Sequence, residues 1–434
     1  MVLLLLPNQL FEKKHLDKKQ TIHLWEHPHY FKDYNYNKKK LILHRASMRA
    51  YYDYLVKNKF KVEYVPFSKK YSFKAGEEYT MFDPINKMER LGIKKKGITI
   101  LNSPNFLLTT ELHEAYRKKT DKFFFNGFYM WSKEKTGILP GVKSQDKQNR
   151  KTMPKGVKIP KPPNNKKDAP YIKEAIAYVN KFFPRNYGDV EDFMFPVSHI
   201  TAKKWLVDFM KKRFQKFGDY QDFIKEEENF MFHSLLSTSI NIGLLNPSDV
   251  VEEAKKYKSK TPMNSYEGFI RQLFWREYQR YCYLYYNFNK QNYFGNKKKL
   301  TKKWYDGTLS VPPVDDAIKA GFKTGYMHHI LRLMVVGNYM NLSGIAPMEG
   351  FKWFMEFSCD SYEWVMYQNV LDMVFFVSGG KTMRRPYISS SNYILKMSDY
   401  KKGEWCDIWD ENYQGFIKKN RPKLLKFRYY FRNL

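Results

Sequence analysis

Two adjacent histidines, His328 and His329, could carry out proton transfer. An imidazole exchanges a proton near neutral pH, which few other side chains do. On a helix, neighbouring side chains point about 100° apart, so at most one of the two faces a given ligand. Their spacing does not fit a zinc pair, which needs histidines at i and i+4. The alternative is that both are ordinary hydrogen-bonded helix histidines.

A second motif lies at residues 269–278, within a helix expected over 264–286. Gln272, Trp275 and Arg276 fall at i, i+3 and i+4, hence on one face of that helix. The face offers an amide, an aromatic plane and a fixed positive charge, a combination that suits a flat anionic heteroaromatic ligand. The alternative is an aromatic core stripe with a surface arginine.

A third motif, residues 233–239, is rich in hydroxyl groups and includes Ser234 and Ser237. Hydroxyl and backbone N–H groups at the start of a helix could hold a diphosphate. Ordinary helix capping is the alternative for such a cluster.

A fourth motif places a carboxylate in an aromatic and apolar stretch, residues 353–364. Asp360 in such surroundings needs a positively charged partner, because an unpaired buried charge is costly. The pattern makes Arg332 the nearest candidate.

The charge of the chain indicates a polyanionic partner. Lys plus Arg is 76 and Asp plus Glu is 44, which gives a formal net charge of +32 over 434 residues. Lysines interleaved with 34 Tyr, 34 Phe and 9 Trp are typical of a nucleic-acid binder. Solubility or codon bias is the alternative explanation of the lysines.

Composition also excludes several classes of protein. Apolar residues make up 43% of the chain, which rules out a wholly disordered protein. The longest apolar run near the start, residues 2–6, is too short for a membrane span or a signal sequence. Three widely spaced cysteines exclude a disulfide scaffold and a zinc pattern. We therefore expect a soluble, intracellular protein, in the cytoplasm or a DNA-containing compartment.

The elements that must position these motifs fall into two regions. Strands are expected at 2–6, 21–25, 61–66 and 97–101, with a helix at 38–57, so residues 1–131 read as an α/β domain with a parallel sheet. Residues 132–196, with prolines among Lys and Asn, read as a linker. Residues 197–434 read as a helical domain, with a helix from 326 to about 342.

Together the motifs resemble the photolyase/cryptochrome superfamily, and within it the photolyase-related branch of bacterial (6-4) photolyases. The resemblance covers nearly the whole chain and depends on the order and spacing of short segments. These segments are 6–10, 40–48, 103–106, 228–234, 241–247, 269–278, 326–329, 362–369, 387–389 and 397–400.

The resemblance implies an α/β antenna domain joined by a long linker to an all-α catalytic domain that binds FAD. It also implies roles for single residues, which we name by motif position. FAD would be held by Tyr220, Ser234, Leu236, Ser237, Arg276, Arg332 and Asp360. Gln272, Trp275 and Tyr387 would face a flipped-out lesion, His329 with His328 would transfer a proton, and Tyr305, Trp353 and Tyr393 would transfer electrons.

The chain departs from the branch at its metal site. Relatives carry four cysteines for a [4Fe–4S] cluster, whereas the aligned positions here are Pro313, Lys401 and Glu404, and the fourth is deleted. We therefore expect no iron–sulfur cluster. Met366 stands where a polar residue is expected near the flavin. An antenna chromophore such as a ribityllumazine would lie near Gln9 and Glu26, with Trp25 close enough to fill that space.

These features favour light-driven repair of UV-damaged DNA by a (6-4) photolyase-like lyase that acts as a monomer. A (6-4) product must gain a proton as well as an electron, which the histidine pair could supply, whereas a cyclobutane dimer needs the electron alone. The alternatives are a cyclobutane-dimer photolyase, a cryptochrome-like blue-light photoreceptor, and a nucleic-acid-binding protein that kept the fold and lost the flavin.

Overall fold

The computed structural model describes residues 1–94 and 97–431 of the chain. The chain forms two compact units, each assembled from segments far apart in sequence. The first, which we call the sheet unit, comprises Met1–Glu114, Lys161–Arg213 and Ser234–Lys260. The second, the helical unit, comprises Ala115–Pro160, Phe214–His233 and the chain from Thr261 onward. The domain boundaries expected from the sequence stay a prediction.

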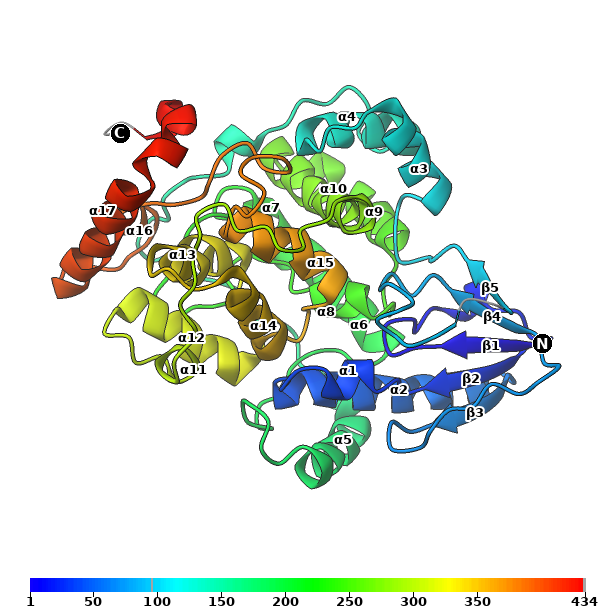
Figure 1. The fold of residues 1–434 in the computed structure, drawn as a ribbon. Coiled ribbons are helices and arrows are strands. Elements are labelled where there is room, and N and C mark those ends of the chain that lie inside the picture. The colour runs from blue at the N-terminus through cyan, green and yellow to red at the C-terminus, as the bar shows by residue number, and fades with distance from the viewer. Residues whose placement is uncertain (95–96, 432–434) are drawn as a thin grey trace. The chain divides into compact units, whose positions relative to one another are not determined.

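The sheet unit is built on five parallel strands in the order β3-β2-β1-β4-β5 (Figure 1). The strands are β1 (Val2–Leu5), β2 (Thr21–Trp25), β3 (Lys61–Val65), β4 (Tyr79–Phe82) and β5 (Ile98–Leu101). The central strand β1 is fully buried, as its unbroken apolar run predicts. The parallel α/β sheet is therefore confirmed, and β4 is the strand that the sequence analysis did not predict.

The helices of the sheet unit begin and end as follows: α1 (His29–Lys32), α2 (Lys38–Lys57), α5 (Ala169–Phe182), α6 (His199–Lys212), α8 (Ser237–Asn241) and α9 (Pro247–Lys255). Short 3₁₀ turns lie at Lys13–His15, Lys166–Asp168 and Lys258–Lys260. The long helix α2 has the predicted bounds. Its first turn is capped by Asn37, whose side-chain oxygen accepts a hydrogen bond from the backbone N–H of Lys39 at 2.9 Å.

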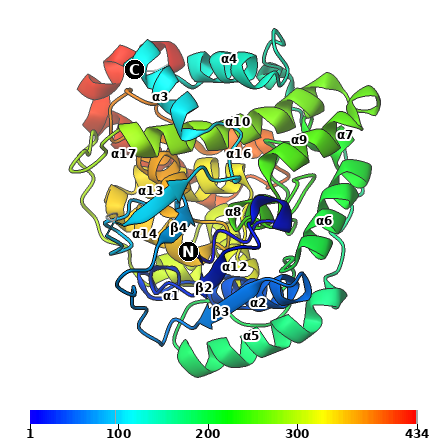
Figure 2. The same cartoon turned by 90° about the vertical axis from the view of Figure 1, so that its right-hand side faces the viewer.

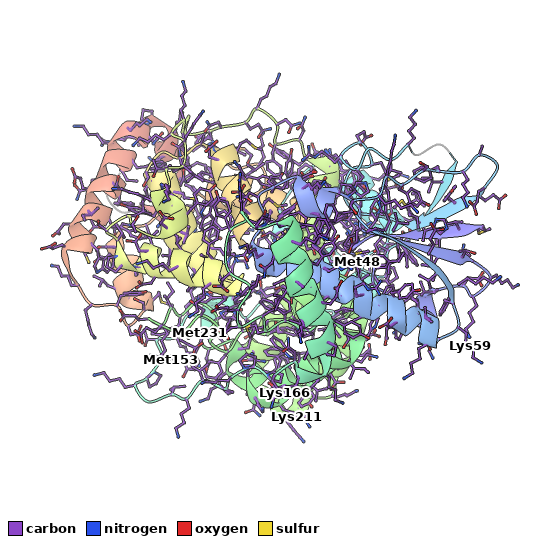
Figure 3. The ribbon with its side chains drawn as sticks, turned by 90° about the horizontal axis from the view of Figure 1, so that it is seen from below. Met48, Lys59, Met153, Lys166, Lys211 and Met231 are labelled. Atoms are coloured by element: carbon purple, nitrogen blue, oxygen red, sulfur yellow. The ribbon has the colours of Figure 1, made fainter. Side chains whose placement is uncertain are left out.

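Helix α5 lies in the stretch expected to be a linker. It packs against α2, and Figure 3 marks the two elements with Met48 on α2 and Lys166 just before α5. Ala175 and Val179 are the fully buried residues of α5, one turn apart on the same face. This narrow apolar stripe, preceded by prolines and lysines, explains why the sequence alone did not indicate a helix.

The helical unit contains α4 (Phe125–Thr136), α7 (Phe214–Phe217), α10 (Met263–Tyr285), α11 (Lys303–Asp306), α12 (Pro312–Thr324), α13 (Asn338–Leu342), α14 (Pro347–Phe357), α15 (Glu363–Gln368), α16 (Ser391–Met397) and α17 (Glu404–Leu424). Its 3₁₀ turns lie at Asp146–Gln148 and Leu425–Tyr430, and α3 (Thr110–Lys119) spans the division between the units. Helix α10 is buried along most of its length beside α4 (Figure 2), and it confirms the predicted helix.

Two turns of π-helix interrupt the helical unit, at Leu331–Gly337 and Asn369–Val374. They pack against each other, and a Cβ added at Gly337 would lie 2.8 Å from Val374 Cγ1. A π-turn holds one residue more than an α-turn and is frequent at functional sites. The first of these turns carries Arg332.

None of the helices in the described part of the chain has an apolar stretch of the length that a bilayer crossing needs.

Candidate functional site

Arg332 and Asp360 form an ion pair in the helical unit. Arg332 Nη2 lies 2.9 Å from Asp360 Oδ1, and both side chains are nearly buried. Arg332 Nε also donates to the backbone oxygen of Met327 at 2.7 Å, and the hydroxyl of Ser358 donates to Asp360. The pair forms as the sequence pattern predicted. The pair places a fixed positive charge on the π-turn. Asp360 and the backbone oxygen of Met327 set the orientation of the Arg332 guanidinium.

His328 is the buried member of the histidine pair. Its ring stacks on that of His233 with centroids 4.7 Å apart and planes 10° apart. Within the described residues, neither ring nitrogen of His328 has a hydrogen-bond partner. Burial, followed by the charges of neighbouring basic groups, holds the pKa of His328 well below its usual value. A neutral ring with two unused nitrogens inside the protein is a site that a bound ligand could complete.

His329 is the exposed member of the pair. Although solvent reaches its ring, surrounding protein lowers the pKa of His329 to about 4, with further lowering by Arg332 and Arg271. The imidazole is therefore neutral at pH 7 in the ligand-free protein. The sequence analysis assumed a nearly neutral pKa for this role, so a bound anion would have to raise the pKa before His329 could give up a proton.

A group of alternating charges lies next to this histidine. Arg271 Nη2 is 2.8 Å from Asp146 Oδ1, and Arg150 contacts the other carboxylate oxygen of Asp146 at 3.1 Å and Asp222 at 3.4 Å. Burial raises the pKa of Asp222 to about 6, against the lowering by Arg150. The sequence analysis did not identify this group, because its members lie far apart in the chain and none stands in a distinctive motif.

Tyr387 and Tyr393 belong to the same electrostatic environment. Burial raises the pKa of both phenols, and the charge of Arg150 lowers both. The guanidinium of Arg385 lies 5.3 Å from the ring centroid of Tyr387. Tyr387 and Tyr393 therefore both interact electrostatically with the charged residues near His329. The predicted roles of the two tyrosines in lesion binding and electron transfer stay predictions.

The expected face of α10 is only partly available to a ligand. Trp275 stacks on Phe125 of α4, with centroids 3.6 Å apart and planes 8° apart, so one side of its ring is covered. Gln272 donates from Nε2 to the backbone oxygen of Gly268 at 3.2 Å. Arg276 lies over Trp364 at 4.8 Å, and burial lowers its pKa to about 9, which leaves it charged at pH 7.

The two remaining electron-transfer candidates are connected by rings. Trp353 is fully buried and donates from Nε1 to the backbone oxygen of Trp304 at 2.8 Å. The ring of Phe322 lies 5.6 Å from Trp353 and 5.9 Å from Tyr305, between centroids. Trp353 also lies 4.8 Å from Phe357, over which the guanidinium of Arg332 sits at 5.3 Å.

The diphosphate candidates are divided between the units. Ser234, Leu236 and Ser237 lie together in the sheet unit, where the N–H of Leu236 donates to the Ser234 hydroxyl at 3.4 Å. Among the described residues, the buried hydroxyls of Thr238 and Ser239 have no hydrogen-bond partner. These orphaned hydroxyls fit a segment that binds a polar ligand. Tyr220 belongs to the helical unit, with its ring 5.5 Å from Phe232.

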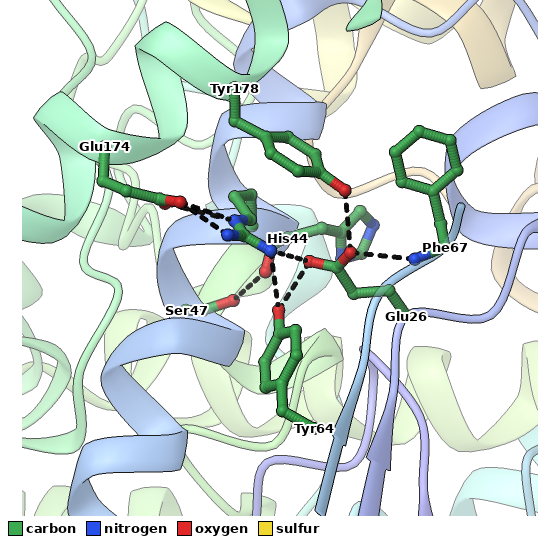
Figure 4. A network of polar contacts seen from close by, with 8 residues as sticks. Glu26, His44, Ser47, Tyr64, Phe67, Glu174 and Tyr178 are labelled. Carbon is green, nitrogen blue, oxygen red and sulfur yellow. Dashed lines mark hydrogen bonds and ion pairs between the residues drawn. The ribbon is translucent and has the colours of Figure 1, made fainter. Parts of the chain in front are cut away.

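The polar atoms of the two antenna candidates have hydrogen-bond partners within the protein. The carboxylate of Glu26 is inaccessible and accepts four hydrogen bonds (Figure 4), from Arg45 Nη1 at 2.9 Å, Tyr64 OH at 2.5 Å, the Phe67 N–H at 3.0 Å and Tyr178 OH at 2.9 Å. A carboxylate has about four acceptor positions, so none is left for a ligand.

Both polar atoms of the Gln9 side chain also form hydrogen bonds within the protein. Its Oε1 accepts from the backbone N–H of Leu6 at 3.1 Å, and its Nε2 donates to the backbone oxygen of Phe82 at 2.8 Å. These bonds join the carboxyl ends of β1 and β4, where strand order reverses and where open sheets usually bind ligands. Trp25 stacks on Tyr71 with centroids 4.7 Å apart. An antenna chromophore near Gln9 and Glu26 stays a prediction.

Cys282, Cys359 and Cys406 are each buried and unbridged. Across residues 1–94 and 97–431, no cluster of three or more His, Cys, Asp and Glu side chains is arranged to bind a metal. Absence of an iron–sulfur cluster stays a prediction from the sequence.

Known proteins resemble this chain in sequence and in fold. A family model described as deoxyribodipyrimidine photo-lyase-related protein matches residues 3–195. A (6-4) photolyase of Agrobacterium fabrum is 34% identical over 319 residues, which is 68% of this chain and 63% of that relative. The match thus spans less than two thirds of the relative's own length.

Two solved structures share the architecture over almost the entire chain. A cryptochrome of Synechocystis sp. PCC6803 has a TM-score of 0.61 at 15% identity, covering 98% of this chain and 89% of that one. An archaeal photolyase of Sulfolobus tokodaii, described with two FAD molecules, has a TM-score of 0.59 at 13% identity, covering 97% and 100%.

A parallel α/β unit combined with a helical unit is the architecture of photolyases and cryptochromes, as these structures demonstrate. The match to the family model and to the Agrobacterium relative supports the photolyase-related branch of the photolyase/cryptochrome superfamily.

Proposed function

We propose that this protein uses blue light and FAD to repair a UV lesion in DNA, with (6-4) photoproducts as the substrate. The observation that carries the proposal is the adjacency of three groups where one helical segment begins: the buried His328 just before it, the accessible His329 at its start, and Arg332 in its ion pair with Asp360. Such an arrangement offers a polar anchor and a proton-transfer group side by side.

The residues of the chain fit FAD. Arg332, held by Asp360, would contact the flavin, and His328 has two unused ring nitrogens to offer it. Ser234, Leu236, Ser237 and Tyr220 would hold the diphosphate, and the orphaned hydroxyls beside Ser237 favour this assignment. When bound and reduced, FAD supplies on illumination the electron that splits the lesion.

The protein's own contribution to the reaction is charge placement and a proton. Asp360 keeps the charge of Arg332 in one place, so the site is preorganised for an anionic ligand. His329 has to hold a proton in order to pass it to a (6-4) product. A lesion phosphate or an anionic ligand next to its ring would raise the pKa from about 4, so protonation would be coupled to substrate binding.

The proposed partner is UV-damaged DNA. The net charge of +32 favours binding to phosphates, and damaged bases cost less to flip out of the stack than intact ones.

A cryptochrome-like photoreceptor is the second candidate, because a cryptochrome shares this fold over 98% of the chain. A photoreceptor would bind the same flavin and leave the DNA unchanged. A cyclobutane-dimer photolyase is the third, and it would not need the proton of His329.

Illumination of the FAD-loaded protein with two oligonucleotides, one with a (6-4) product and one with a cyclobutane dimer, decides among the three. We expect loss of the (6-4) product in the light and not in the dark. Repair of the dimer alone would establish the third candidate. No repair of either lesion by flavin-loaded protein would leave the photoreceptor.

A further inference from the structure

The turn that follows α17 exposes two aromatic rings. It covers Leu425–Tyr430, at the end of the red helix in Figure 1. Tyr429 is 88% exposed and Tyr430 is 46% exposed. Arg428 lies beside the first of them, with its guanidinium 5.7 Å from the ring centroid of Tyr429. A ring as exposed as that of Tyr429 buries little apolar surface, so the stability of the fold does not explain its position.

The turn is held in place by its other side chains. The ring of Phe427 is buried and lies 5.1 Å from the ring of Phe376, between centroids. Lys426 Nζ donates to the backbone oxygen of Gly379 at 2.8 Å. Both contacts join the turn to residues 376–379, which follow the second π-turn. The exposed rings are thus carried by an anchored segment, which reduces the entropy lost when they bind a partner.

A single arginine connects the turn to a residue expected at the lesion. The guanidinium of Arg385 lies 5.0 Å from the ring centroid of Tyr430 and 5.3 Å from that of Tyr387. Both distances are within the range of a cation–π contact. We call Arg385, Arg428, Tyr429 and Tyr430 the turn surface. This surface extends from the candidate lesion residue Tyr387 to the turn that follows α17.

The two segments that form the turn surface carry positive charge alone. Residues 376–390 contain three Lys or Arg residues, residues 418–431 contain six, and neither segment contains Asp or Glu. Lys381, Arg384 and Arg428 are exposed. A cluster of exposed cations attracts an anionic partner, and the guanidinium group suits phosphate in particular. The turn surface therefore favours a partner that carries phosphates.

The exposed rings distinguish among anionic partners. A nucleotide offers a phosphate to an arginine and a planar base to an aromatic ring. An acidic peptide offers negative charge without the planar base, and a paired duplex keeps the faces of its bases within the stack. Stacking of a base on a side-chain ring depends little on sequence, because every base has a flat face. A DNA strand with unpaired bases is the partner that uses both the rings and the cations.

We propose that the turn surface binds a DNA strand with unpaired bases, with one base stacked on Tyr429 and the neighbouring phosphates held by Arg428 and Arg385. The proposal rests on the proposed function for the origin of this strand, since flipping a lesion out of a duplex leaves nucleotides unpaired. The binding itself depends on the turn surface alone and requires neither flavin nor light. Undamaged single strands should therefore bind as well.

The test measures binding of fluorescent oligodeoxythymidine by anisotropy in the dark, after melting temperatures have been compared. An abasic oligomer of the same length is the second probe, because it has the same phosphates and no bases to stack. We expect Tyr429→Ala to weaken binding of oligodeoxythymidine by about 5- to 150-fold, the usual loss for one stacked base. The same variant should bind the abasic oligomer as the wild type does. Tyr429→Phe keeps the flat ring and should bind both probes normally.

Arg428→Gln tests the phosphate contact separately. This variant should weaken binding of both probes. The slope of log affinity against log salt concentration should become shallower by about 0.7, the value for one phosphate of a single strand. A loss of affinity for oligodeoxythymidine alone, with an unchanged salt slope, would overturn the phosphate contact and the proposal with it.

Tyr257, in the sheet unit, provides the matched control. It also stands next to lysines in the sequence, but Lys255 Nζ lies 2.6 Å from Glu252 Oε1 and Lys256 Nζ lies 2.6 Å from Glu253 Oε2. Because these charges are balanced locally, Tyr257→Ala should bind both probes as the wild type does.

Four results would overturn the proposal. The first two are an unchanged affinity of Tyr429→Ala for oligodeoxythymidine and an equal loss for the abasic oligomer. The others are an equal loss in Tyr257→Ala, and displacement of oligodeoxythymidine by polyglutamate as readily as by unlabelled strand. A wild type that repairs neither lesion, while Tyr429→Ala shows the expected loss of binding, would instead overturn the proposed function and leave the strand-binding surface in place.

Discussion

At the scale of single residues, the charges around the π-turn decide what the helical unit can bind. Arg332 is oriented by Asp360 and by the backbone oxygen of Met327, while the two histidines next to it are neutral. The arginine is therefore the permanent cation of this turn, and the histidines respond to whatever lies beside them.

Removing either member of the ion pair should expel the flavin. Arg332→Ala or Asp360→Ala leaves the other charge nearly buried and unpaired. In similar cases, this change lowers the free energy of unfolding by about 3–5 kcal/mol. Flavin absorbance per protein and the melting temperature measure the effect. Lys323→Ala, at an exposed position on α12, is the control and should retain both. Full flavin content in both alanine variants would contradict the assigned role of the pair.

His329→Ala should reduce repair activity without reducing stability or flavin content. The side chain is exposed, so we expect stability and flavin content near wild type. Repair of a (6-4) product should fall by about 10²–10⁴-fold, the usual loss when a general acid is removed. Repair of a cyclobutane dimer should persist if the protein can repair it at all. A variant that repairs (6-4) products at the wild-type rate would end this assignment.

At the scale of elements, the sheet unit depends on polar clamps at the carboxyl ends of its strands. Glu26 follows β2 and binds Arg45 of α2 and Tyr178 of α5 at the same time. Gln9 joins the ends of β1 and β4. These hydrogen bonds connect segments that are distant in sequence. Removing either side chain would leave its buried donors or acceptors without a hydrogen bond, which destabilises the fold.

Glu26→Gln should destabilise the sheet unit. The amide cannot accept four hydrogen bonds, and its NH₂ group would face the donors of Arg45 or Tyr64. We therefore expect the free energy of unfolding to fall by about 1–3 kcal/mol. Urea unfolding followed by tryptophan fluorescence measures the change. Glu252→Gln, on the exposed side of α9, is the control. An unchanged midpoint would show that the Glu26 network contributes no net stability.

Two buried histidines of the sheet unit should make it sensitive to acid. Burial lowers the pKa of His27, after β2, and of His199, at the start of α6, to about 4 from 6.5. The unfolded chain therefore binds more protons between these values, so the free energy of unfolding should fall as pH drops from 6.5 towards 4. Urea midpoints across this range should depend less steeply on pH in His27→Gln and His199→Gln. A wild-type midpoint independent of pH there would contradict the argument.

The sequence predicted those elements in which buried residues repeat regularly along the chain. The helices at 38–57 and 264–286 and four of the five strands were found, because buried faces repeat along them. α5 buries only Ala175 and Val179 fully, so it gives no clear periodic signal, whereas the missed strand β4 is no shorter than β1 and β5, which were predicted. The Arg332–Asp360 pair could be predicted from charge in an apolar stretch. The stacking of His233 on His328 and the contact of Tyr305 with Glu356 could not, since they depend on how distant segments pack.

At the scale of the whole molecule, the strongly basic composition of the chain is its most prominent property. The net charge of +32 is the property that undamaged DNA would sense first.

Binding to undamaged duplex DNA should be weak and steeply dependent on salt. Each neutralised phosphate contributes a slope of about −0.9 to a plot of log affinity against log salt concentration. Fluorescence anisotropy between low and physiological salt measures this slope. Duplex with a single (6-4) product should bind more tightly at every salt concentration, because a damaged base is easier to flip. An affinity independent of salt would rule out phosphate contacts as its source.

The π-turn at Leu331–Gly337 makes the length of its helix as important as its composition. Because the turn holds one extra residue, deleting a single residue after Arg332, such as Val335, could return the segment to regular α-helix. Every side chain beyond the deletion would then rotate by about 100° relative to Arg332. Gly337 would leave its close approach to Val374, and Asn338 would leave Ser389. Reading-frame-preserving insertions and deletions, rather than exchanges of one amino acid for another, are thus the mutations to which this helix is least tolerant.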